Sequence, residues 1–244
     1  MFKKKLPPFI VDIHCHILPG VDDGSRNMSE TIAMLKIAKK SGITHIFATP
    51  HYKTGHRNVS PKGIERLTMR VLDEAEKQGI NIDIASGNEV LFFSEFDDYF
   101  EHGCFCGMND QDFVLVEFLP EDRFEYIKNA LDLIQGLGIT PILAHIERYS
   151  CFIENFENAR IIHNMGVQVQ VNAADVTGFM GRRVKKFIHR VLKAQLVDYI
   201  GSDAHRCKGK RTPCIKKCVK RLYRKYPEKY VDRILYKNAF KYLL

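Results

Sequence analysis

Two patterns of apolar and polar residues succeed each other along this chain from one end to the other. Short runs rich in β-branched residues, bounded by glycine or polar turns, predict strands. The stretches between them carry apolar residues near helical spacing and predict helices. The predicted strands lie near residues 9–14, 43–49, 82–89, 113–118, 140–144, 167–171 and 196–202.

The stretch at residues 29–38 illustrates the helical pattern. Ser29 is a candidate N-cap, and the apolar positions 32, 34, 35 and 38 recur near helical spacing. Gly42 is expected to end this helix in a left-handed conformation before the next strand. Gly79, Gly138 and Gly166 stand in the same place before later strands.

Seven βα units, with no internal repeat or low-complexity linker, predict the fold class. We expect an α/β fold, a distorted TIM-like barrel of about seven parallel βα units. No glycine-rich dinucleotide fingerprint follows the first strand, which counts against a Rossmann enzyme. The 244 residues fit one barrel domain, 1–244. Residues 213–244 are predicted to form two helices, broken at Pro227, that pack on or extend the barrel.

Composition adds charge and compartment to this picture. The chain has 45% hydrophobic residues and a net charge of +8, which together favour a globular protein with anionic partners. Asp12 and His14 interrupt the apolar stretch after the basic start, so no export signal is expected. No apolar run approaches the ~20 residues of a membrane span. The seven cysteines have no regular framework, so we expect reduced thiols and a cytoplasmic protein.

Metal-ligating residue types stand at the carboxyl ends of six predicted strands or in the loop after the first strand. His14 and His16 alternate along an extended chain and therefore point to the same side. Each residue alone has a plain explanation as a core histidine, a solvated carboxylate or a cap. Their repetition at one rim, where barrel enzymes build active sites, favours a metal site. The candidates are His14, His16, Asp23, His51, Glu89, Glu117, His145, Asp203 and His205.

Five imidazoles and four carboxylates suit manganese, iron or zinc, and manganese is expected first. Calcium or a thiolate-bound structural zinc would need other ligands. Four carboxylates set against three divalent ions leave about two positive charges, which match a phosphate dianion. The set therefore indicates phosphoester hydrolysis.

The segments that carry these residues are 12–24, 48–51, 87–89, 145–149 and 201–205. They resemble the PHP superfamily, named for polymerase and histidinol phosphatase, and within it the bacterial capsule and exopolysaccharide tyrosine phosphatases. The resemblance runs from about residue 9 to 215 and implies a PHP phosphatase domain. It implies one metal bound by His14, His16, Glu89 and Asp203. It also implies a second bound by Glu89, Glu117 and His145, and a third bound by Asp23, His51 and His205.

Two arginines are candidate phosphate clamps, because a guanidinium contacts two oxygens at once. Arg148 follows His145, and Arg211 lies in the loop after His205. Lys210 competes with Arg211 for this role, and a solvated loop charge is the plain alternative. Spacing also leaves open whether Asp22 or Asp23 is the metal ligand.

The resemblance implies a protein-tyrosine phosphatase that acts on the phosphorylated, acidic tail of a bacterial tyrosine kinase and regulates capsule or exopolysaccharide biosynthesis. A histidinol-phosphate phosphatase or another small-molecule PHP phosphoesterase is the alternative, which the loop at residues 19–24 and the compact length disfavour. The basic run at residues 208–225 is either a solvated helix face or a surface for an acidic tail or the inner leaflet of a membrane. A nucleic-acid partner is disfavoured, since no aromatic and basic binding strip is evident.

Two cysteine patterns are rejected as sites. Cys218 and Arg224 have the spacing of thiol-based tyrosine phosphatases, but the segment lacks glycine and predicts a basic amphipathic helix. Cys104 and Cys106 are too close for a usual zinc knuckle and have no second pair.

Overall fold

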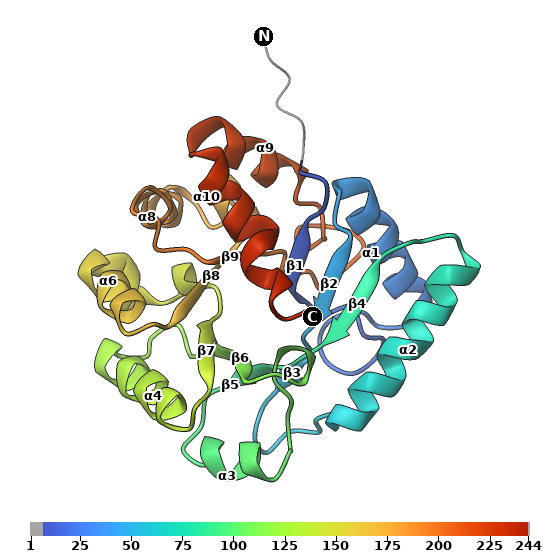
Figure 1. Ribbon diagram of the computed structural model, residues 1–244, viewed down its shortest axis with the longest axis horizontal. Coiled ribbons are helices and arrows are strands. Elements are labelled where there is room, and N and C mark those ends of the chain that lie inside the picture. The colour runs from blue at the N-terminus through green and yellow to red at the C-terminus, as the bar shows by residue number, and fades with distance from the viewer. Residues whose placement is uncertain (1–6, 244) are drawn as a thin grey trace.

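A computed structural model describes residues 7–243 of the chain. The basic start at residues 1–6, on which part of the expectation about export rests, lies outside the described residues, as does residue 244. The described chain forms a ring of strands surrounded by helices (Figure 1). The strands are β1 (Val11–Cys15), β2 (His45–Ala48), β3 (His51–Tyr52), β4 (Asp83–Ser86), β5 (Glu89–Leu91), β6 (Phe113–Glu117), β7 (Thr140–Leu143), β8 (Gln168–Asn172) and β9 (Tyr199–Gly201).

All strand pairs are parallel and form two sheets, β1-β2-β4 and β3-β5-β6-β7-β8-β9. Strand β3 follows β2 after two residues, and β5 likewise follows β4. Each of these two pairs is therefore one interrupted strand that passes from the first sheet into the second. A parallel bridge between Cys15 and Ala204 joins the segment after β9 to the end of β1. The strands thus occupy seven positions around a closed, distorted barrel, and the predicted fold class is confirmed.

The interruptions lie just before two candidate ligands. The prediction of one strand over residues 82–89 is wrong, because β4 ends before Gly87 and β5 begins at Glu89. A Cβ on Gly87 would lie 2.9 Å from the Met108 Sδ, so glycine lets the Met108 side chain pack closely against the break. Pro50, which has no N–H, separates β2 from β3. His51 and Glu89 then pair in register.

Helices cover the outside of the barrel (Figure 1). There are also two short 3-10 helices, η1 (Met108–Asp110) and η2 (Ile146–Arg148), and a π-helix, η3 (Arg233–Lys237), which joins the last two helices. Within residues 7–243, no helix combines the length and apolarity needed to cross a membrane. The helices are α1 (Met28–Ser41), α2 (Pro61–Lys77), α3 (Phe96–Glu101), α4 (Phe124–Gly136), α5 (Ser150–Glu154), α6 (Phe156–Asn164), α7 (Ala173–Thr177), α8 (Arg182–Lys193), α9 (Lys216–Lys225), α10 (Glu228–Asp232) and α11 (Asn238–Phe240).

Helix α1 starts earlier than the sequence predicted. Asn27 is its N-cap, with an extended backbone and a side chain that accepts a hydrogen bond from the Glu30 N–H at 3.0 Å. Ser29 lies inside the first turn, so its predicted capping role is wrong, because a capping residue must stay outside the helix. The predicted stop is confirmed, since Gly42 has a φ of 90°.

The C-terminal segment covers the amino ends of the strands. Helix α9 ends at Lys225 and Pro227 is the N-cap of α10, which confirms the predicted break. The rings of Tyr236 and Phe240 pack edge-on against Phe9, with centroids 4.7 and 4.6 Å away. Because Phe9 precedes β1, this packing leaves the carboxyl ends of the strands free for a site at the other end of the barrel.

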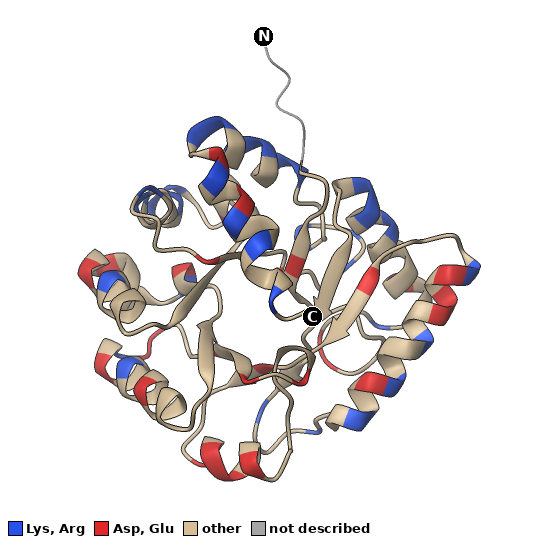
Figure 2. Cartoon of the chain, in the orientation of Figure 1, with Lys and Arg blue, Asp and Glu red and all other residues tan. Residues whose placement is uncertain are grey.

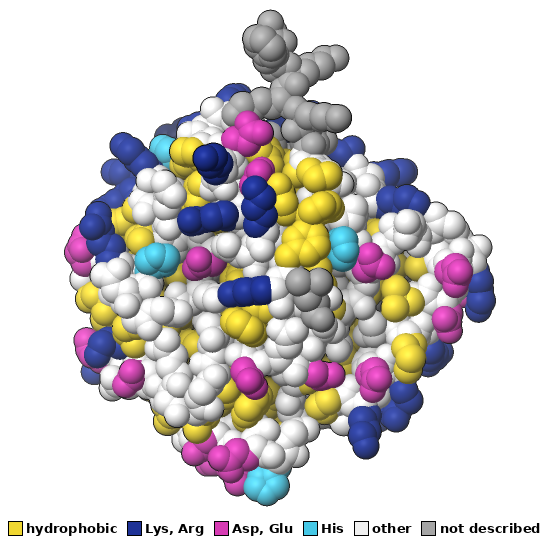
Figure 3. Space-filling model, in the orientation of Figure 1, with side chains coloured by type: hydrophobic (Ala, Val, Ile, Leu, Met, Phe, Trp, Pro, Cys, Tyr) yellow, Lys and Arg dark blue, Asp and Glu magenta, His cyan; other side chains and the backbone are white. Residues whose placement is uncertain are grey.

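Charge is unevenly distributed along the chain. Residues 182–225 contain 16 of the 37 Lys and Arg residues but two of the 29 Asp and Glu residues, so the rest of the chain holds 21 basic and 27 acidic residues. Figure 2 shows blue ribbon concentrated on α8 and α9 and red ribbon on α3. In the space-filling view the same upper left edge carries dark blue side chains, and the lower edge carries magenta ones (Figure 3).

Candidate metal centre

Glu89 is the hub of the residues that converge at the carboxyl ends of the strands. Its Oε2 lies 3.1 Å from the His14 Nε2, 3.2 Å from the His16 Nε2 and 3.0 Å from the His51 Nδ1. Its Oε1 lies 2.8 Å from the His145 Nε2. Four imidazoles from three different strand ends therefore surround one buried carboxylate.

The remaining ligand-type residues extend this cluster on either side. The Glu117 Oε1 lies 3.0 Å from the His51 Nδ1. The Asp23 Oδ1 lies 3.4 Å from the His51 Nε2 and 3.3 Å from the His205 Nε2. The Asp203 Oδ1 lies 3.4 Å from the His205 Nδ1. All nine residues named from the sequence thus lie in one contiguous site.

Three groups of these side chains place one ligand atom each within 4.8 Å of one another. The groups are His16, Asp23, His51 and His205; His14, His16 and Glu89; and His51, Glu89 and Glu117. They differ from the sets that the resemblance implied, since His16 and His51 each belong to two groups.

The donor atoms fit divalent metal ions. Four buried atoms of the site lack a hydrogen-bond partner, namely the His51 Nδ1, Glu89 Oε2, Glu117 Oε1 and His205 Nε2. Buried polar atoms without a partner are costly, and a cation bound between them would remove that cost. Imidazole nitrogens and carboxylate oxygens, without a thiolate, are the ligand set expected for manganese, iron or zinc.

Asp22 and Asp23 have different places in the site. Asp22 accepts a hydrogen bond from the His16 Nδ1 at 2.8 Å and from the N–H groups of Gly24 and His51. Burial opposes its ionisation, but the hydrogen bond from His16 lowers its pKa to about 2. Asp23 points its carboxylate at two imidazoles instead. The geometry therefore favours Asp23 as a ligand and Asp22 as the residue that orients His16 and leaves its Nε2 free.

Glycine is required where this loop meets His16. A Cβ on Gly24 would lie 2.4 Å from the His16 carbonyl oxygen and 2.7 Å from the Asp22 Oδ1. Such distances leave no room for any side chain. Gly24 therefore allows the loop of Asp22 and Asp23 to lie directly against β1.

Two candidate ligands have strained backbones. His145 has a φ of 31° and Asp203 a φ of 50°, in the left-handed region that residues other than glycine rarely adopt. The Gln170 Oε1 accepts a hydrogen bond from the His145 N–H at 2.7 Å, and the His14 carbonyl accepts one from the Asp203 N–H at 2.8 Å. The surrounding structure thus holds both strand ends in conformations that are typical of functional sites.

Arg148 and Arg211 meet at Asp203. The Arg211 Nη2 donates to the Asp203 Oδ1 at 2.6 Å, and Arg148 donates to the Oδ2 of the same carboxylate. Burial opposes the ionisation of Asp203, but His14 and Arg148 hold its pKa below its ordinary value. Lys210 instead lies over the ring of Phe179, with 5.5 Å from its Nζ to the centroid. The structure therefore brings Arg211, and not Lys210, to the candidate centre.

Strand β8 supplies two residues that the sequence interpretation missed. The Gln170 Oε1 lies 3.2 Å from the His14 Nδ1, and the Asn172 Nδ2 donates to the Asp203 Oδ2 at 2.9 Å. A hydrogen bond to Nδ1 leaves the Nε2 of His14 free to bind a metal. The available signal was alternation, since Gln168, Gln170 and Asn172 share one face of an otherwise valine-rich strand.

The chain matches the family model described as capsular polysaccharide synthesis, CpsB/CapC, over residues 10–244. The chain belongs to the CpsB/CapC family. Over 240 residues it is 28% identical to the tyrosine-protein phosphatase CpsB of Streptococcus pneumoniae, which covers 96% of this chain and 98% of that protein. Over 202 residues it is 29% identical to the tyrosine-protein phosphatase YwqE of Bacillus subtilis, which covers 82% of this chain and 78% of that protein.

Solved structures agree with this CpsB/CapC membership. A crystal structure from a study of Bacillus subtilis YwqE and Streptococcus pneumoniae CpsB, called metal-dependent tyrosine phosphatases, superposes with a TM-score of 0.89 at 27% identity and covers 96% of this chain and 94% of that one. A histidinol phosphate phosphatase from Lactococcus lactis superposes with a TM-score of 0.56 at 18% identity and covers 87% and 93%. The second likeness shows a shared fold alone.

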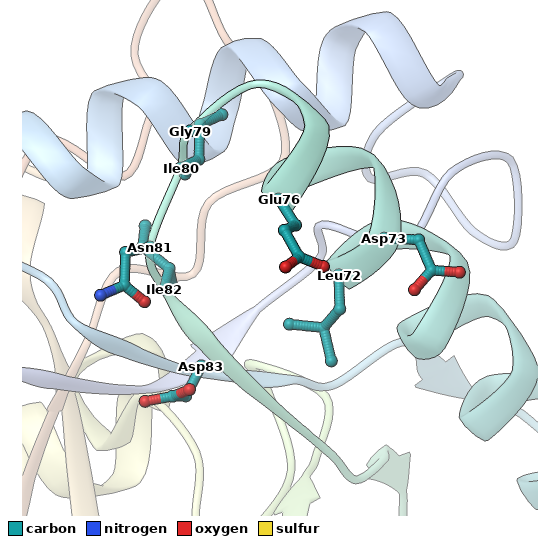
Figure 4. Close-up of a pocket in the computed structure, with 8 residues that line it drawn as sticks. All are labelled: Leu72, Asp73, Glu76, Gly79, Ile80, Asn81, Ile82 and Asp83. Carbon is teal, nitrogen blue, oxygen red and sulfur yellow. The ribbon is translucent and has the colours of Figure 1, made fainter.

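Cavity size does not locate the chemistry in this CpsB/CapC protein. A pocket of about 390 Å³ lies between the end of α2 and the start of β4 (Figure 4). It opens near the amino end of β4, away from the candidate ligands. A pocket of about 310 Å³ lies beside them and is lined by Val21, Asp22, Asp23, His51, Lys53, His56, Arg57 and Asn58.

Neither rejected cysteine pattern forms a site. Cys218 is buried in α9, and burial raises the pKa of its thiol. Cys106 is also buried, and burial raises the pKa of its thiol to about 12. Within residues 7–243, no group of potential metal ligands includes a cysteine.

Proposed function

We propose that this protein is a metal-dependent protein-tyrosine phosphatase that acts in the cytoplasm. Its substrate would be the phosphorylated, acidic tail of a bacterial tyrosine kinase, so that its activity regulates capsule or exopolysaccharide biosynthesis. The observation that carries the proposal is the convergence of nine ligand-type residues, with Glu89 as their hub, beside two arginines. Membership in the CpsB/CapC family supports the choice of phosphotyrosine.

The proposed ligands are His14, His16, Asp23, His51, Glu89, Glu117, His145, Asp203 and His205. We propose three divalent ions, manganese first, with iron or zinc as alternatives. When bound, such ions activate a water molecule and neutralise charge on a phosphoryl group. Burial and the charge of Arg148 lower the pKa of His145, which favours the neutral imidazole that ligation requires. At His16 burial is outweighed by the hydrogen bonds to Asp22 and Glu89, which raise the pKa to about 10, so a bound ion would displace a proton there.

Arg148 and Arg211 are proposed to bind the phosphoryl oxygens. Their side chains are 29% and 37% exposed, so both can be reached from the mouth of the barrel. The buried Arg211 Nε has no hydrogen-bond partner, which leaves a donor for a ligand. The phenolate of the product has a pKa near 10, so its departure requires less protonation than that of an alkoxide.

The adjoining pocket supports an acidic peptide as substrate. Lys53, His56 and Arg57 line it together with Asp23 and His51. The cationic side chains of Lys53 and Arg57, next to the proposed phosphoryl site, suit acidic residues near a phosphotyrosine. A small substrate such as histidinol phosphate would not need them.

We further propose that residues 1–244 act as one PHP domain, with residues 213–244 packed on the barrel. The Tyr230 OH donates to the Val197 carbonyl at 3.2 Å. The Asn238 Nδ2 donates to the Asp198 carbonyl at 3.0 Å. Both contacts tie the C-terminal helices to the segment around the start of β9.

The test compares a phosphotyrosyl peptide with histidinol phosphate after metal removal and reconstitution with manganese, iron or zinc. We expect metal to restore hydrolysis of the peptide, with a higher kcat/KM than for histidinol phosphate. A preference for histidinol phosphate would favour the small-molecule alternative. Activity that is independent of metal would contradict the proposal.

A further inference from the structure

The turn between α7 and α8 exposes two large apolar side chains. Phe179 is 48% exposed and Met180 is 46% exposed. They stand between Gly178 and Gly181, which have φ values of 103° and 94°. The backbone of the turn is nevertheless held, because the Met180 N–H donates to the Asp175 Oδ1 at 2.9 Å and the Phe179 N–H to the Ala174 carbonyl at 3.3 Å. The two side chains thus form an apolar tip on a fixed support.

Cationic side chains lie close to this tip. The Lys185 side chain of α8 lies against Gly178, and the Lys210 Nζ lies over the Phe179 ring. A pocket of about 400 Å³ is lined by Thr177, at the end of α7, and by four residues of α9. Those four residues are Lys217, Lys220, Arg221 and Arg224.

The two helices beside the tip contain no acidic residue. Helices α8 and α9 each contain six Lys or Arg residues. Of those on α8, Arg183 pairs with Glu154 and Arg190 lies over Phe156. Among the described residues, the four cations of the α9 pocket are in no ion pair. They are therefore free for an external anion.

We propose that this face binds the surface of an anionic phospholipid bilayer, with Phe179 and Met180 in the interface and the α9 pocket over lipid phosphates. A bilayer is favoured because two large apolar side chains project beside unpaired cations, whereas binding to the backbone of a nucleic acid needs cations alone. Interfacial binding combines buried apolar area with attraction to anionic lipid. The proposal does not depend on the phosphatase activity.

The test measures co-sedimentation with vesicles of phosphatidylglycerol and phosphatidylcholine, and with vesicles of phosphatidylcholine alone. We expect binding to the anionic vesicles that weakens as ionic strength rises. A cation near an anionic surface contributes roughly fivefold to partitioning, so Lys217→Glu with Lys220→Glu and Arg224→Glu should lower binding by at least roughly a hundredfold. Phe179→Ser with Met180→Ser should lower it roughly tenfold.

Helix α2 supplies matched controls on another part of the surface (Figure 1). Its Met69 is 50% exposed, and Lys62, Arg66 and Arg70 are exposed around it. The helix also contains Glu65, Asp73, Glu74 and Glu76, so its charge is balanced. Lys62→Glu with Arg66→Glu and Arg70→Glu makes the same change in net charge as the α9 variant, and Met69→Ser is the control for the loss of one exposed apolar side chain. Both should retain vesicle binding.

Thermal unfolding and turnover of a phosphotyrosyl peptide check that each variant is folded. Loss of vesicle binding with unchanged turnover supports the proposal. Equal loss in the α2 controls, or full binding after Phe179→Ser with Met180→Ser, would overturn it.

Two further probes address other anions. Wild-type protein that binds a glutamate-rich peptide or duplex DNA but not the anionic vesicles would assign this face to a polyanion and overturn the membrane proposal. Displacement from vesicles by inorganic phosphate, at a concentration where sodium chloride of equal ionic strength has no effect, would assign the pocket to free phosphate and overturn it too.

Discussion

The mouth of the barrel and helix α9 both contain residues typical of tyrosine phosphatases. At the mouth these side chains converge, whereas in α9 they point apart. At the mouth, His14 from the start of the chain and His145 from its middle lie 3.1 and 2.8 Å from the oxygens of Glu89. In α9, Cys218 is buried while Arg224, six residues later, is exposed. Positions six apart fall on different sides of a helix, so this pair cannot grip one phosphate.

The difference arises from the backbone that carries the residues in each region. Parallel strands bring their carboxyl ends to one rim, so residues distant in sequence meet there. A thiol-based phosphatase needs a loop whose N–H groups face the phosphate, but the N–H groups within a helix are bonded to its own carbonyls. The same residue types therefore predict chemistry only together with the backbone that carries them.

The largest expected effect comes from removing two imidazoles at the mouth. His14→Ala with His16→Ala should lower bound metal and reduce turnover of a phosphotyrosyl peptide by at least about a thousandfold, while the barrel stays folded. Metal analysis, steady-state kinetics and circular dichroism measure these outcomes. His102→Ala, at an exposed histidine of the segment after α3, is the control that should keep full activity. Full activity in the double variant would contradict the proposed metal centre.

The arginines at the mouth should give a smaller effect. Each charge-assisted contact to phosphate contributes about 1.5–3 kcal/mol, so Arg148→Ala or Arg211→Ala should lower kcat/KM roughly 10- to 100-fold. Arg→Lys should restore part of this, because lysine keeps the charge but loses the two-point contact. Arg160→Ala, at an exposed residue of α6, is the control.

Metal analysis of the same variants separates substrate binding from metal binding. We expect metal content to be retained, although both arginines contact Asp203. Wild-type kinetics in either alanine variant would exclude that arginine from the site. Lost metal would mean that its role is to hold Asp203.

Gln170 should affect metal binding more than catalysis. Because its Oε1 lies 3.2 Å from the His14 Nδ1, Gln170→Ala should weaken metal affinity by roughly 10- to 100-fold and leave turnover at saturating metal near the wild-type value. Activity titrated against metal concentration measures this shift. Gln78→Ala, far from the centre at the end of α2, should leave the titration unchanged. An unchanged titration for Gln170→Ala would mean that His14 is oriented by packing alone.

The smallest effect is expected in α9. Cys218→Ser and Arg224→Ala should each keep near-normal turnover, because burial raises the pKa of the thiol and a protonated thiol is a poor nucleophile. A chelator should inhibit the wild-type enzyme, and a thiol alkylator should not. Inhibition by the alkylator but not by the chelator would indicate a thiol-based mechanism and would contradict a metal site at the mouth.

Strand periodicity and residue type determined much of the architecture from sequence alone. Apolar runs placed all seven strand positions, and the ligand types at their ends and in the loop after the first strand named the nine residues that the structure brings together. These predictions depend on local rules, since alternation sets which residues share a face and parallel strands set which ends meet. Gly42 and Pro227 also act locally. Gly42 ends a helix in a left-handed conformation, and Pro227 breaks a helix because it has no N–H.

Tertiary structure decided the features that depend on contacts between distant segments. Asp22 and Asp23 are adjacent and chemically alike, and only the positions of His16 and His205 distinguish them. Gln170 orients His14 across 156 positions of sequence. The position of Asp203 likewise decides that Arg211, and not Lys210, contacts the site. Local spacing cannot encode such pairs, because register and loop conformation place one segment against another only when the barrel closes.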